Sequence, residues 1–393
     1  MTLNYSKDEL LRLGAIHTAH EISQQPAVWK KVIEILKEKQ NEIEEFLQFL
    51  NNTYSNVRVI LTGAGTSAYV GETVLPYLKQ NHQYENFRYE TIATTDIVAA
   101  PYYYFKKDTP TLLVSFARSG NSPESLAATQ LGEQLVDQFF QLVITCNEDG
   151  QLAINTKSNN RSLLLLMPEE TNDKGFAMTS SFTSMLLSAS IVFQTKNLDR
   201  VQHSLQSIIG HGDTFLSNHL QTIDDIANET FTRIVYLGSA VFQGLARESA
   251  LKMLELTSGQ TMAVYESPLG FRHGPKSMIH DETIIVIFIS NDPYTRKYDI
   301  DMMKEIYNQQ LNVKIVAVAQ NSSDAIKNHC HYLIDNVLGE TSPDMQLAFL
   351  NILFAQTLAL KKSIQLGVQP DNPSPSGIVN RVVQGVIIYP YHQ

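Results

Sequence analysis

The sequence is poor in cysteine and has no block of basic residues. Its 393 residues include only two cysteines, Cys146 and Cys330, which lie far apart and belong to no cluster of metal-ligating residues. A disulfide framework is therefore not expected. The formal net charge of −10 and the lack of a long Lys/Arg run argue against a nucleic-acid partner or an anionic membrane surface, because such partners are held by basic footprints.

Long hydrophobic runs are also missing. The longest are LLLLM at residues 163–167 and IIVIFI at 284–289, which are far shorter than a membrane span. The first residues, MTLNYSKDELLR, lack the charged and then apolar pattern of a signal peptide. We therefore expect a cytoplasmic protein with no membrane partner. Its hydrophobic content of 43% is sufficient for the cores of two ordinary domains.

The chain contains two related copies of one pattern, at an offset of 173 residues. The first copy reads VRVILTGAGTSAYVGE at residues 57–72, and the second reads TRIVYLGSAVFQGLARE at 232–248. At this offset Gly65 pairs with Gly238, Gly71 pairs with Gly244, and two later apolar runs also correspond. Self-similarity at a fixed spacing indicates an internal duplication.

Each copy alternates short apolar runs with helical periodicity, which is typical of a doubly wound α/β fold, a parallel sheet flanked by helices on both faces. We predict strands at 57–62, 111–115, 142–145 and 162–167 in the first copy. In the second copy we predict them at 233–237, 283–289, 313–318 and 331–334. Helices are expected at 185–193, at 346–364 and within the stretch 5–50. The predicted domains are an N-terminal helical segment (1–50), the first copy (51–200) and the second copy with a Pro- and Ser-rich tail (201–393).

Two hydroxyl-rich turns follow strands of the first copy. In a parallel sheet, ligands collect at the carboxyl ends of the strands, where glycine-rich turns lead into helix N-termini. Helix capping alone accounts for one serine, which precedes a proline at the first helical position. Two such turns at adjacent strand ends favour a phosphate site. The candidate ligands are Gly65, Thr66 and Ser67 in the first turn and Arg118, Ser119, Asn121 and Ser122 in the second.

The second copy has GSAVFQG and SNDPYT at these places and carries a charged helix instead. In LARESALKMLELTSG, Glu248, Lys252 and Glu255 are spaced by four and three residues, so all three project from one helix face. A solvated ion pair is the simple alternative. The other residues of the helix are mostly small or apolar, which indicates a buried helix, and buried charges are costly unless paired or used.

A basic loop, SPLGFRHGPKS, follows that helix. It places His273 between Arg272 and Lys276, among glycines and a proline. A lone histidine in a turn is usually only a turn residue. Histidine is also the side chain whose ordinary pKa suits proton exchange near neutral pH, so we consider it together with the charged helix.

Six strings in the chain resemble the sugar isomerase (SIS) superfamily. They are GAGTS, ARSGNSPES, GFAMTSSF, ARESALKMLELT, GFRHGPKS and NPSPSGIVNRVVQGVI. Within that superfamily the chain is similar to AgaS-type proteins, described as tagatose-6-phosphate ketose/aldose isomerases or galactosamine-6-phosphate deaminases. The resemblance spans nearly the whole chain and implies two tandem SIS domains. It extends more distantly to the isomerase half of glucosamine-6-phosphate synthase, whose glutaminase half has no counterpart in this sequence.

The resemblance also implies roles for particular residues. Glu255 would be the base that moves a proton between C1 and C2, and His273 the ring-opening acid/base, reaching the site from a neighbouring subunit. Glu248 and Lys252 match charged site residues of the family. Ser67, Ser119 and Ser122 would bind phosphate. The wider set of substrate-binding residues is Gly65, Thr66, Arg118, Asn121, Ser180 and Arg381.

The chain departs from the synthase pattern at two places. Ala117 and Arg118 stand where the synthase has serine and glutamine, so the phosphate contacts must be redistributed. A site lysine of the synthase is replaced near Arg381, and a guanidinium does not readily form a Schiff base. Any mechanism here should therefore use the amine carried by the sugar.

We accordingly expect an enzyme that converts galactosamine 6-phosphate to tagatose 6-phosphate and ammonia, with no metal or other cofactor. If His273 acts across an interface, the protein is at least a homodimer. One alternative is an aldose/ketose isomerase that acts on tagatose 6-phosphate without deamination. Another is a regulator that only senses sugar phosphates, for which the charged helix face would be unnecessary.

Overall fold

A computed structural model describes residues 1–336, 341–383 and 385–392 of the chain. It divides into two compact units, each made of segments that are separate in sequence. Unit 1 comprises Met1–Pro26, Lys174–Ala177 and His203–Pro375, and unit 2 comprises Ala27–Asp173, Met178–Gln202 and Ser376–Gln393. Each unit contains one five-stranded sheet. The domain boundaries expected from the sequence stay a prediction.

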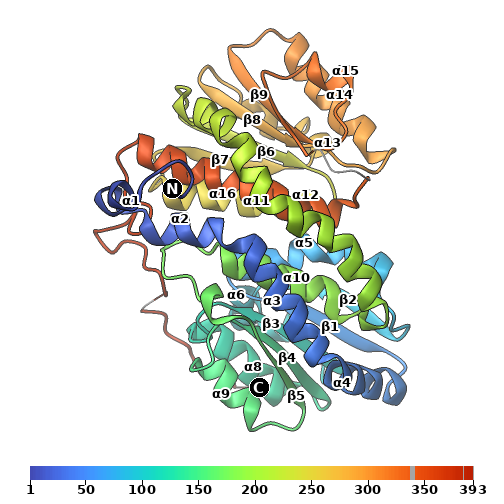
Figure 1. The fold of residues 1–393 in the computed structure, drawn as a ribbon. Helices are drawn as coiled ribbons and strands as arrows, with labels where there is room; N and C mark the ends of the chain where they lie inside the picture. Colours follow the sequence, from blue (N-terminus) through green and yellow to red (C-terminus); the bar gives the residue numbers. More distant parts are fainter. Residues whose placement is uncertain (337–340, 384, 393) are drawn as a thin grey trace. The chain divides into compact units, whose positions relative to one another are not determined.

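The sheet of unit 2 is built from the first copy of the repeat (Figure 1). Its strand order is β2-β1-β3-β4-β5, and every neighbouring pair is parallel. Its strands are β1 (Val57–Thr62), β2 (Phe87–Thr91), β3 (Thr111–Ala117), β4 (Phe139–Thr145) and β5 (Ser162–Leu166). The helices of this part of the chain are α3 (Gln25–Glu38), α4 (Gln40–Thr53), α5 (Thr66–Asn81), α6 (Thr94–Ala99), α7 (Pro101–Tyr104), α8 (Pro123–Leu135), α9 (Gln151–Lys157) and α10 (Ser180–Val192), with 3₁₀ turns η1 (Glu169–Thr171) and η2 (Thr195–Asn197).

The sheet of unit 1 repeats this topology. Its strand order is β10-β9-β8-β6-β7. When β6 to β10 are matched with β1 to β5 in chain order, this is the order of the first sheet read from the opposite edge. Its strands are β6 (Arg233–Gly238), β7 (Met262–Glu266), β8 (Thr283–Phe288), β9 (Val313–Ala319) and β10 (Tyr332–Asp335). The remaining helices are α1 (Lys7–Leu13), α2 (Ile16–Ser23), α11 (Leu198–Asn228), α12 (Val241–Leu256), α13 (Pro268–Phe271), η3 (Pro275–Met278), α14 (Thr295–Asn308), α15 (Asp324–Lys327) and α16 (Asp344–Gln365). The predicted α/β class with two parallel sheets is confirmed.

All eight predicted strands are present, with ends shifted by up to three residues. The two missed strands, β2 and β7, are edge strands with sequences FRYET and MAVYE. Central parallel strands are buried on both faces and therefore appear as continuous apolar runs, whereas these two carry charged or exposed residues. The helical stretch at residues 5–50 is confirmed as four helices, α1 to α4.

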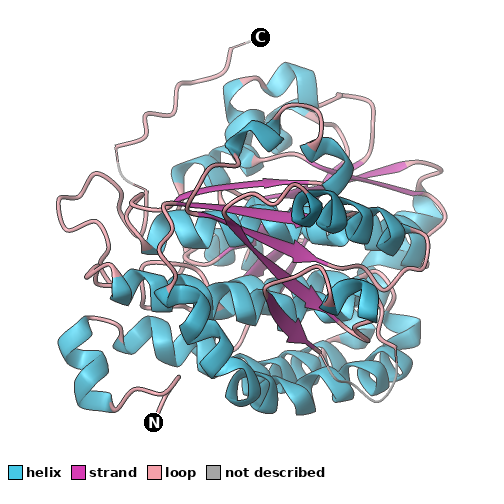
Figure 2. Ribbon diagram, turned by 90° about the horizontal axis from the view of Figure 1, so that it is seen from above, coloured by secondary structure: helices cyan, strands magenta, loops and turns pink. Residues whose placement is uncertain are grey.

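Helices cover both faces of each sheet (Figure 2). In the first sheet, Ile60 belongs to a core cluster with residues of α6 and α8. Its neighbour Leu61 lies on the other face, where its Cβ is close to Gly71 of α5. Successive strand residues point to opposite faces, so one strand contributes to two apolar layers.

The second sheet packs on α13, α14 and α15 through one large core cluster, and α12 packs against β6, β7 and α16. Helix α16 is long and apolar enough to cross a membrane by length and composition alone. Within unit 1, however, 94% of its most apolar 18-residue window is buried. This helix is therefore a core element of the unit.

The fixed offset of 173 residues proposed from the sequence is wrong at the first turn. A Cβ on Gly63 would lie 2.5 Å from the backbone of Ser67, and a Cβ on Gly238 would lie 2.4 Å from the backbone of Phe242. The equivalent close-approach glycines are thus Gly63 and Gly238, 175 residues apart. Gly65 corresponds instead to Ala240, since both precede the first helical residue with φ near +55°. The loops of the two copies differ in length, so no single offset holds throughout.

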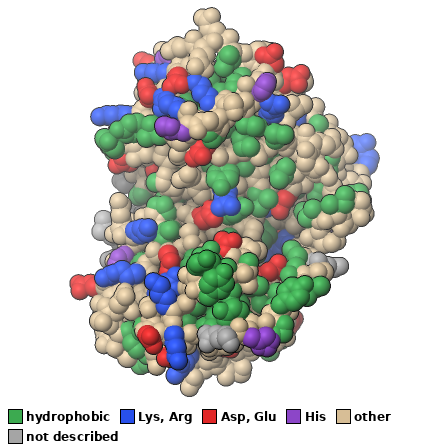
Figure 3. Space-filling view, turned by 180° about the vertical axis from the view of Figure 1, so that it is seen from behind, with side chains coloured by type: hydrophobic (Ala, Val, Ile, Leu, Met, Phe, Trp, Pro, Cys, Tyr) green, Lys and Arg blue, Asp and Glu red, His purple; other side chains and the backbone are tan. Residues whose placement is uncertain are grey.

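The tail from Asp371 onwards contains no helix or strand among its described residues. Its start is anchored in unit 1, where the Asp371 carboxylate accepts hydrogen bonds from the backbone N–H groups of His17 and Thr18, at 3.0 and 2.8 Å. On the surface seen in Figure 3, basic and acidic side chains are interspersed among the described residues.

Candidate active site

The first sheet has its topological switch point between β1 and β3. Thr62 at the end of β1 pairs with Ser115 of β3, and the strand order reverses between these two strands. In open α/β sheets, ligands bind in the crevice outside the carboxyl ends of the strands at this point. Both hydroxyl-rich turns of the first copy leave the sheet here, as the sequence predicted.

The turn after β1 is held in shape by its glycines. Gly63 lies against the backbone of Ser67, and Gly65 has φ of +57°, a conformation that favours glycine. Thr66 and Ser67 then open α5, and both side chains are almost entirely buried. The Ser67 hydroxyl is 4.0 Å from the sulfur of Met178, a weak contact. This hydroxyl is therefore available for a stronger acceptor, such as a phosphate oxygen.

The turn after β3 is fixed through its backbone. The Asn147 amide donates to the carbonyl of Ser119 at 2.9 Å, and the Asn121 side chain accepts from the backbone N–H of Gln151 at 2.9 Å. Ser122 is the N-cap of α8, with Pro123 at the first helical position, but its hydroxyl makes no capping hydrogen bond. Capping therefore fails to account for this serine, and the alternative weighed from the sequence is weakened.

Arg118 and Arg381 belong to one network within unit 2. The buried Arg118 guanidinium donates to the carbonyl of Arg381 at 2.6 Å. The Arg381 Nε donates in turn to the carbonyl of Asp173 at 3.1 Å. The fully buried Asp173 carboxylate accepts from the backbone N–H groups of Thr179, Ser180 and Ser181, at 2.8, 3.1 and 3.0 Å.

Sequence reasoning missed Asp173. This residue joins the start of α10, which carries the predicted ligand Ser180, to the tail. No local signal marked it, because Asp173 lies six residues before the N-cap Thr179 and so falls outside the helix-capping pattern. Its contact with residue 381 is 208 positions away in sequence, and no local pattern encodes such a contact.

The charged residues of α12 form a buried triad. The Nζ atom of Lys252 lies 2.5 Å from a carboxylate oxygen of Glu255 and 3.5 Å from one of Glu248. The side chains of Lys252 and Glu248 are completely buried, whereas that of Glu255 keeps 24% of its exposed area. The predicted shared helix face is confirmed. The accessible member is Glu255, the residue expected to act as the base.

The loop that carries His273 is anchored to α14. Arg272 forms ion pairs with Asp301 and Glu305 at 2.8 and 2.7 Å, and Lys276 also pairs with Glu305. These contacts neutralise the basic side chains and leave His273 exposed beside them. In the described part of the chain, no hydrogen bond or ion pair joins His273 to the α12 triad.

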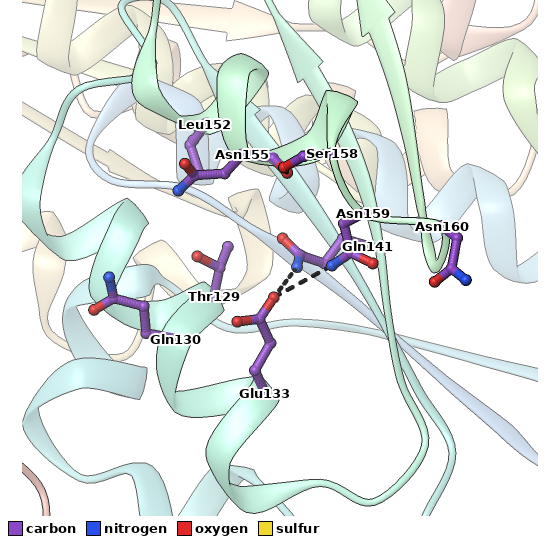
Figure 4. Close-up of a pocket in the computed structure, with 9 residues that line it drawn as sticks. All are labelled: Thr129, Gln130, Glu133, Gln141, Leu152, Asn155, Ser158, Asn159 and Asn160. Atoms are coloured by element: carbon purple, nitrogen blue, oxygen red, sulfur yellow. Dashed lines mark hydrogen bonds between the residues drawn. The ribbon is translucent and has the colours of Figure 1, made fainter.

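Figure 4 shows a polar pocket of unit 2 that lies elsewhere. Glu133 of α8 accepts a hydrogen bond from Gln141 at 2.9 Å, and side chains near the end of α9 face them. Gln141 is near the start of β4, and Asn160 precedes β5. The pocket is therefore at the amino ends of these strands, away from the turns described above, and none of the predicted site residues lines it.

Comparison with known proteins identifies relatives over the whole chain. A family model for the SIS domain matches residues 226–364. The D-galactosamine-6-phosphate deaminase AgaS of Escherichia coli is 43% identical over 95% of this chain and 96% of that protein. A solved structure from Clostridium novyi NT, provisionally assigned as a tagatose-6-phosphate ketose/aldose isomerase, is 48% identical. Its TM-score is 0.96, over 100% of this chain and 99% of that one.

The tagatose-6-phosphate ketose/aldose isomerase structure from Escherichia coli is 39% identical, with a TM-score of 0.86 over 96% of this chain and 97% of that one. Identity at this level over nearly full length on both sides places both copies of the repeat, and not only the matched SIS segment, within one family. The chain belongs to the AgaS family of SIS-domain proteins.

Proposed function

We propose that this protein is a deaminase that converts D-galactosamine 6-phosphate and water to D-tagatose 6-phosphate and ammonia. The observation that carries the proposal is the α12 triad, in which a completely buried ammonium holds a partly exposed carboxylate at 2.5 Å. A protein that only senses sugar phosphates has no use for such an arrangement. The AgaS relative from Escherichia coli carries the name of this activity at 43% identity.

We assign phosphate binding to the two turns of the first sheet. The serine hydroxyls at positions 67, 119 and 122 and the nearby backbone N–H groups are donors suited to a dianionic phosphate. Arg118 supplies positive charge at the same strand end. We also assign Ser180 and Arg381 to substrate binding. Both are hydrogen-bonded to Asp173, which holds them in place.

The reaction begins with opening of the sugar ring, which His273 assists as an acid/base. Glu255 then removes the proton from C2, a C1=C2 double bond forms, and the carbonyl electrons move to the C1 oxygen, which takes up a proton from solvent to give an enaminol. The same carboxyl returns the proton to C1, which leaves a protonated imine at C2. Water adds to this carbon and ammonia departs with the C2–N bond electrons, which gives the ketone. The Lys252 ammonium stabilises the negative charge that develops on the C1 oxygen.

The ion pairs of the 272–276 loop hold His273 at an exposed position of unit 1, where it could act on a neighbouring subunit. We therefore propose a homodimer or a larger homo-oligomer. No step of this mechanism uses a metal, and in the part of the chain that the structure describes no group of three or more His, Cys, Asp or Glu side chains is placed to hold one.

The test is a substrate panel with product analysis. We expect galactosamine 6-phosphate to give ammonia and tagatose 6-phosphate in equal amounts, in the presence of a chelator. In D₂O, part of the product should carry one deuterium at C1, because the carboxyl exchanges its proton with solvent. The names of the two solved relatives favour a second candidate, isomerisation without loss of nitrogen. A ketose product without ammonia would support that candidate and contradict deamination.

The variant Glu255→Gln should lower kcat about 10²–10⁴-fold, the usual contribution of a positioned acid/base, with little change in substrate binding. Glu34→Gln, which removes an exposed carboxylate of α3, is the matched control and should leave kcat unchanged. Full turnover by folded Glu255→Gln protein would remove this residue from the mechanism.

A further inference from the structure

The switch point of the second sheet is built like that of the first. Gly63 follows the β1 rung that pairs Thr62 with Ser115, and Gly238 follows the matching rung that pairs Leu237 with Ile287. Arg118 lies three residues after Ser115 in the turn that follows β3, and Ser290 lies three residues after Ile287 in the turn that follows β8. Helices α8 and α14 both begin five residues later. The backbone N–H groups of residues 290 and 291 therefore correspond to those of residues 118 and 119.

In the second sheet these donors are occupied by carboxylates of the chain itself. Asp299 accepts from the backbone N–H of Ser290 at 2.9 Å and from the Ser239 hydroxyl at 2.8 Å. Asp344 accepts from the backbone N–H of Asn291 at 2.7 Å and from the Ser290 hydroxyl at 2.5 Å. Two carboxylates thus accept the hydrogen bonds that the two turns at this switch point donate.

The matched positions in the first sheet carry no charge. Asp299 is the fifth residue of α14, and the fifth residue of α8 is Ala127. Asp344 is the first residue of α16, and the first residue of α10 is Ser180. At these two positions the second copy therefore carries two negative charges that the first copy lacks, which is also the charge of a phosphate monoester dianion.

The donors around the second switch point are those of a phosphate site. They are backbone N–H groups and serine hydroxyls at the carboxyl ends of parallel strands, with a guanidinium nearby. Arg296 donates to the Ser290 carbonyl and to the Asn291 side chain, both at 3.1 Å. Asp299 is fully buried, so it cannot turn away to admit an anion from solvent without reorganising the core.

We infer that the second switch point is an anion site permanently filled by Asp299 and Asp344, so that each chain binds one phosphate group, at the first sheet only. The duplication thus supplies two equivalent crevices, and the chain's own carboxylates close one of them. The inference rests on the proposed phosphate site for the location of the single bound group. The filling of the second site is a separate claim and can be tested separately.

The decisive variant is the full-length double substitution Asp299→Ala with Asp344→Ser, which installs the residues found at the matched positions of the first copy. Inorganic phosphate is the probe, at pH 8, and sodium chloride of equal ionic strength is the reference. We expect the double variant to bind one more phosphate per chain than the unmodified protein in equilibrium dialysis. We also expect phosphate to raise its Tm by about 2–4 °C more than it raises that of the unmodified protein.

The control is Asp301→Ser, which removes an exposed carboxylate from the same helix without opening the strand end. It should show no additional phosphate uptake. If the double variant does not fold, Asp299→Ala alone is used, and phosphate should restore its Tm where chloride does not. Equal effects of phosphate and chloride, or an unchanged phosphate stoichiometry in a folded variant, would overturn the inference. If the unmodified protein binds no phosphate, the proposed function is contradicted instead. The inference itself concerns only the additional phosphate that the double variant binds.

Discussion

The two sheets have the same strand order and opposite chemistry at their switch points. In the second sheet Asp299 and Asp344 satisfy the hydroxyls and backbone N–H groups of the turns, whereas the matched positions of the first sheet are the uncharged Ala127 and Ser180. The helices that follow β1 and β6 differ in the opposite way, because here the second copy carries the functional charges. Helix α12 carries the charged triad, and the matched positions of α5 are the uncharged Thr73, Tyr77 and Gln80. Under the proposed function, the first copy supplies the anion site and the second copy supplies the charges for proton transfer.

The largest expected effect is on the stability of α12. Lys252→Met removes the cation beside the buried Glu248 carboxylate, and breaking a buried ion pair costs about 3–5 kcal/mol. At the matched position of α5, Tyr77→Phe removes one hydrogen bond from Gln194, worth about 1 kcal/mol. Urea denaturation of both variants measures the difference. Similar losses in the two helices would show that the triad is not energetically distinct.

The second prediction concerns pH. Burial raises the pKa of Asp299 from 3.8 to about 6, although hydrogen bonds from Ser290 and Ser239 oppose the shift. Between about pH 4 and 6 the folded protein retains a proton that the unfolded chain has released. The contribution of Asp299 to stability therefore falls as pH rises through this window, by on the order of 3 kcal/mol.

Asp299→Asn should remove this part of the pH dependence, which is measured as the difference in unfolding free energy between variant and unmodified protein from pH 4 to 7. Asp301→Asn, on the exposed side of the same helix, should leave the profile in place. A difference between Asp299→Asn and the unmodified protein that does not vary with pH would mean that Asp299 titrates normally.

The third prediction compares the turns after β3 and β8. Ser119→Ala removes a proposed donor to phosphate and should raise KM about 10-fold with a smaller effect on kcat, because a hydrogen bond to a charged group is worth roughly 1.5–3 kcal/mol. Asn291→Ala, at the matched position of the second sheet, should change KM by less than about twofold. Steady-state kinetics on the folded variants decides between them. An equal rise in KM for the two variants would contradict the proposal that only the turn after β3 binds the phosphate.

The smallest effect is conformational. Gly65 and Ala240 hold equivalent backbone positions with φ of +57° and +52°. Because nothing lies within 4 Å of a Cβ at position 65, Gly65→Ala should cost only backbone strain, about 1–2 kcal/mol. Ala240→Gly should relieve the same strain and stabilise the protein by roughly 0.5 kcal/mol after the entropy cost of glycine. Thermal unfolding of the pair tests whether the two turns are truly equivalent, and a stabilising Gly65→Ala would show that they are not.

Much of the fold was predictable because parallel strands such as β3 and β8 are continuous apolar runs. The edge strands β2 and β7 were not, since their half-exposed patterns resemble those of loops. The shared face of the α12 triad followed from spacing, and its burial followed from the small and apolar residues around it. The Asp173 network and the occupancy of the second switch point depend on contacts between residues far apart in sequence, as between Asn291 and Asp344, and no local pattern contains them.

The interleaving of the two units has a consequence for synthesis on the ribosome. Unit 1 starts with Met1–Pro26 and ends with Pro375, and unit 2 starts at Ala27 and includes the last segment, Ser376–Gln393. Unit 1 does not have all of its segments until residue 375 has been synthesised, and unit 2 does not until the segment 376–393 has been synthesised. Unit 1 contains the first residues of this sequence but is completed only after most of unit 2 has been made, so the two units are not completed one after the other in chain order, as N-terminal and C-terminal domains usually are.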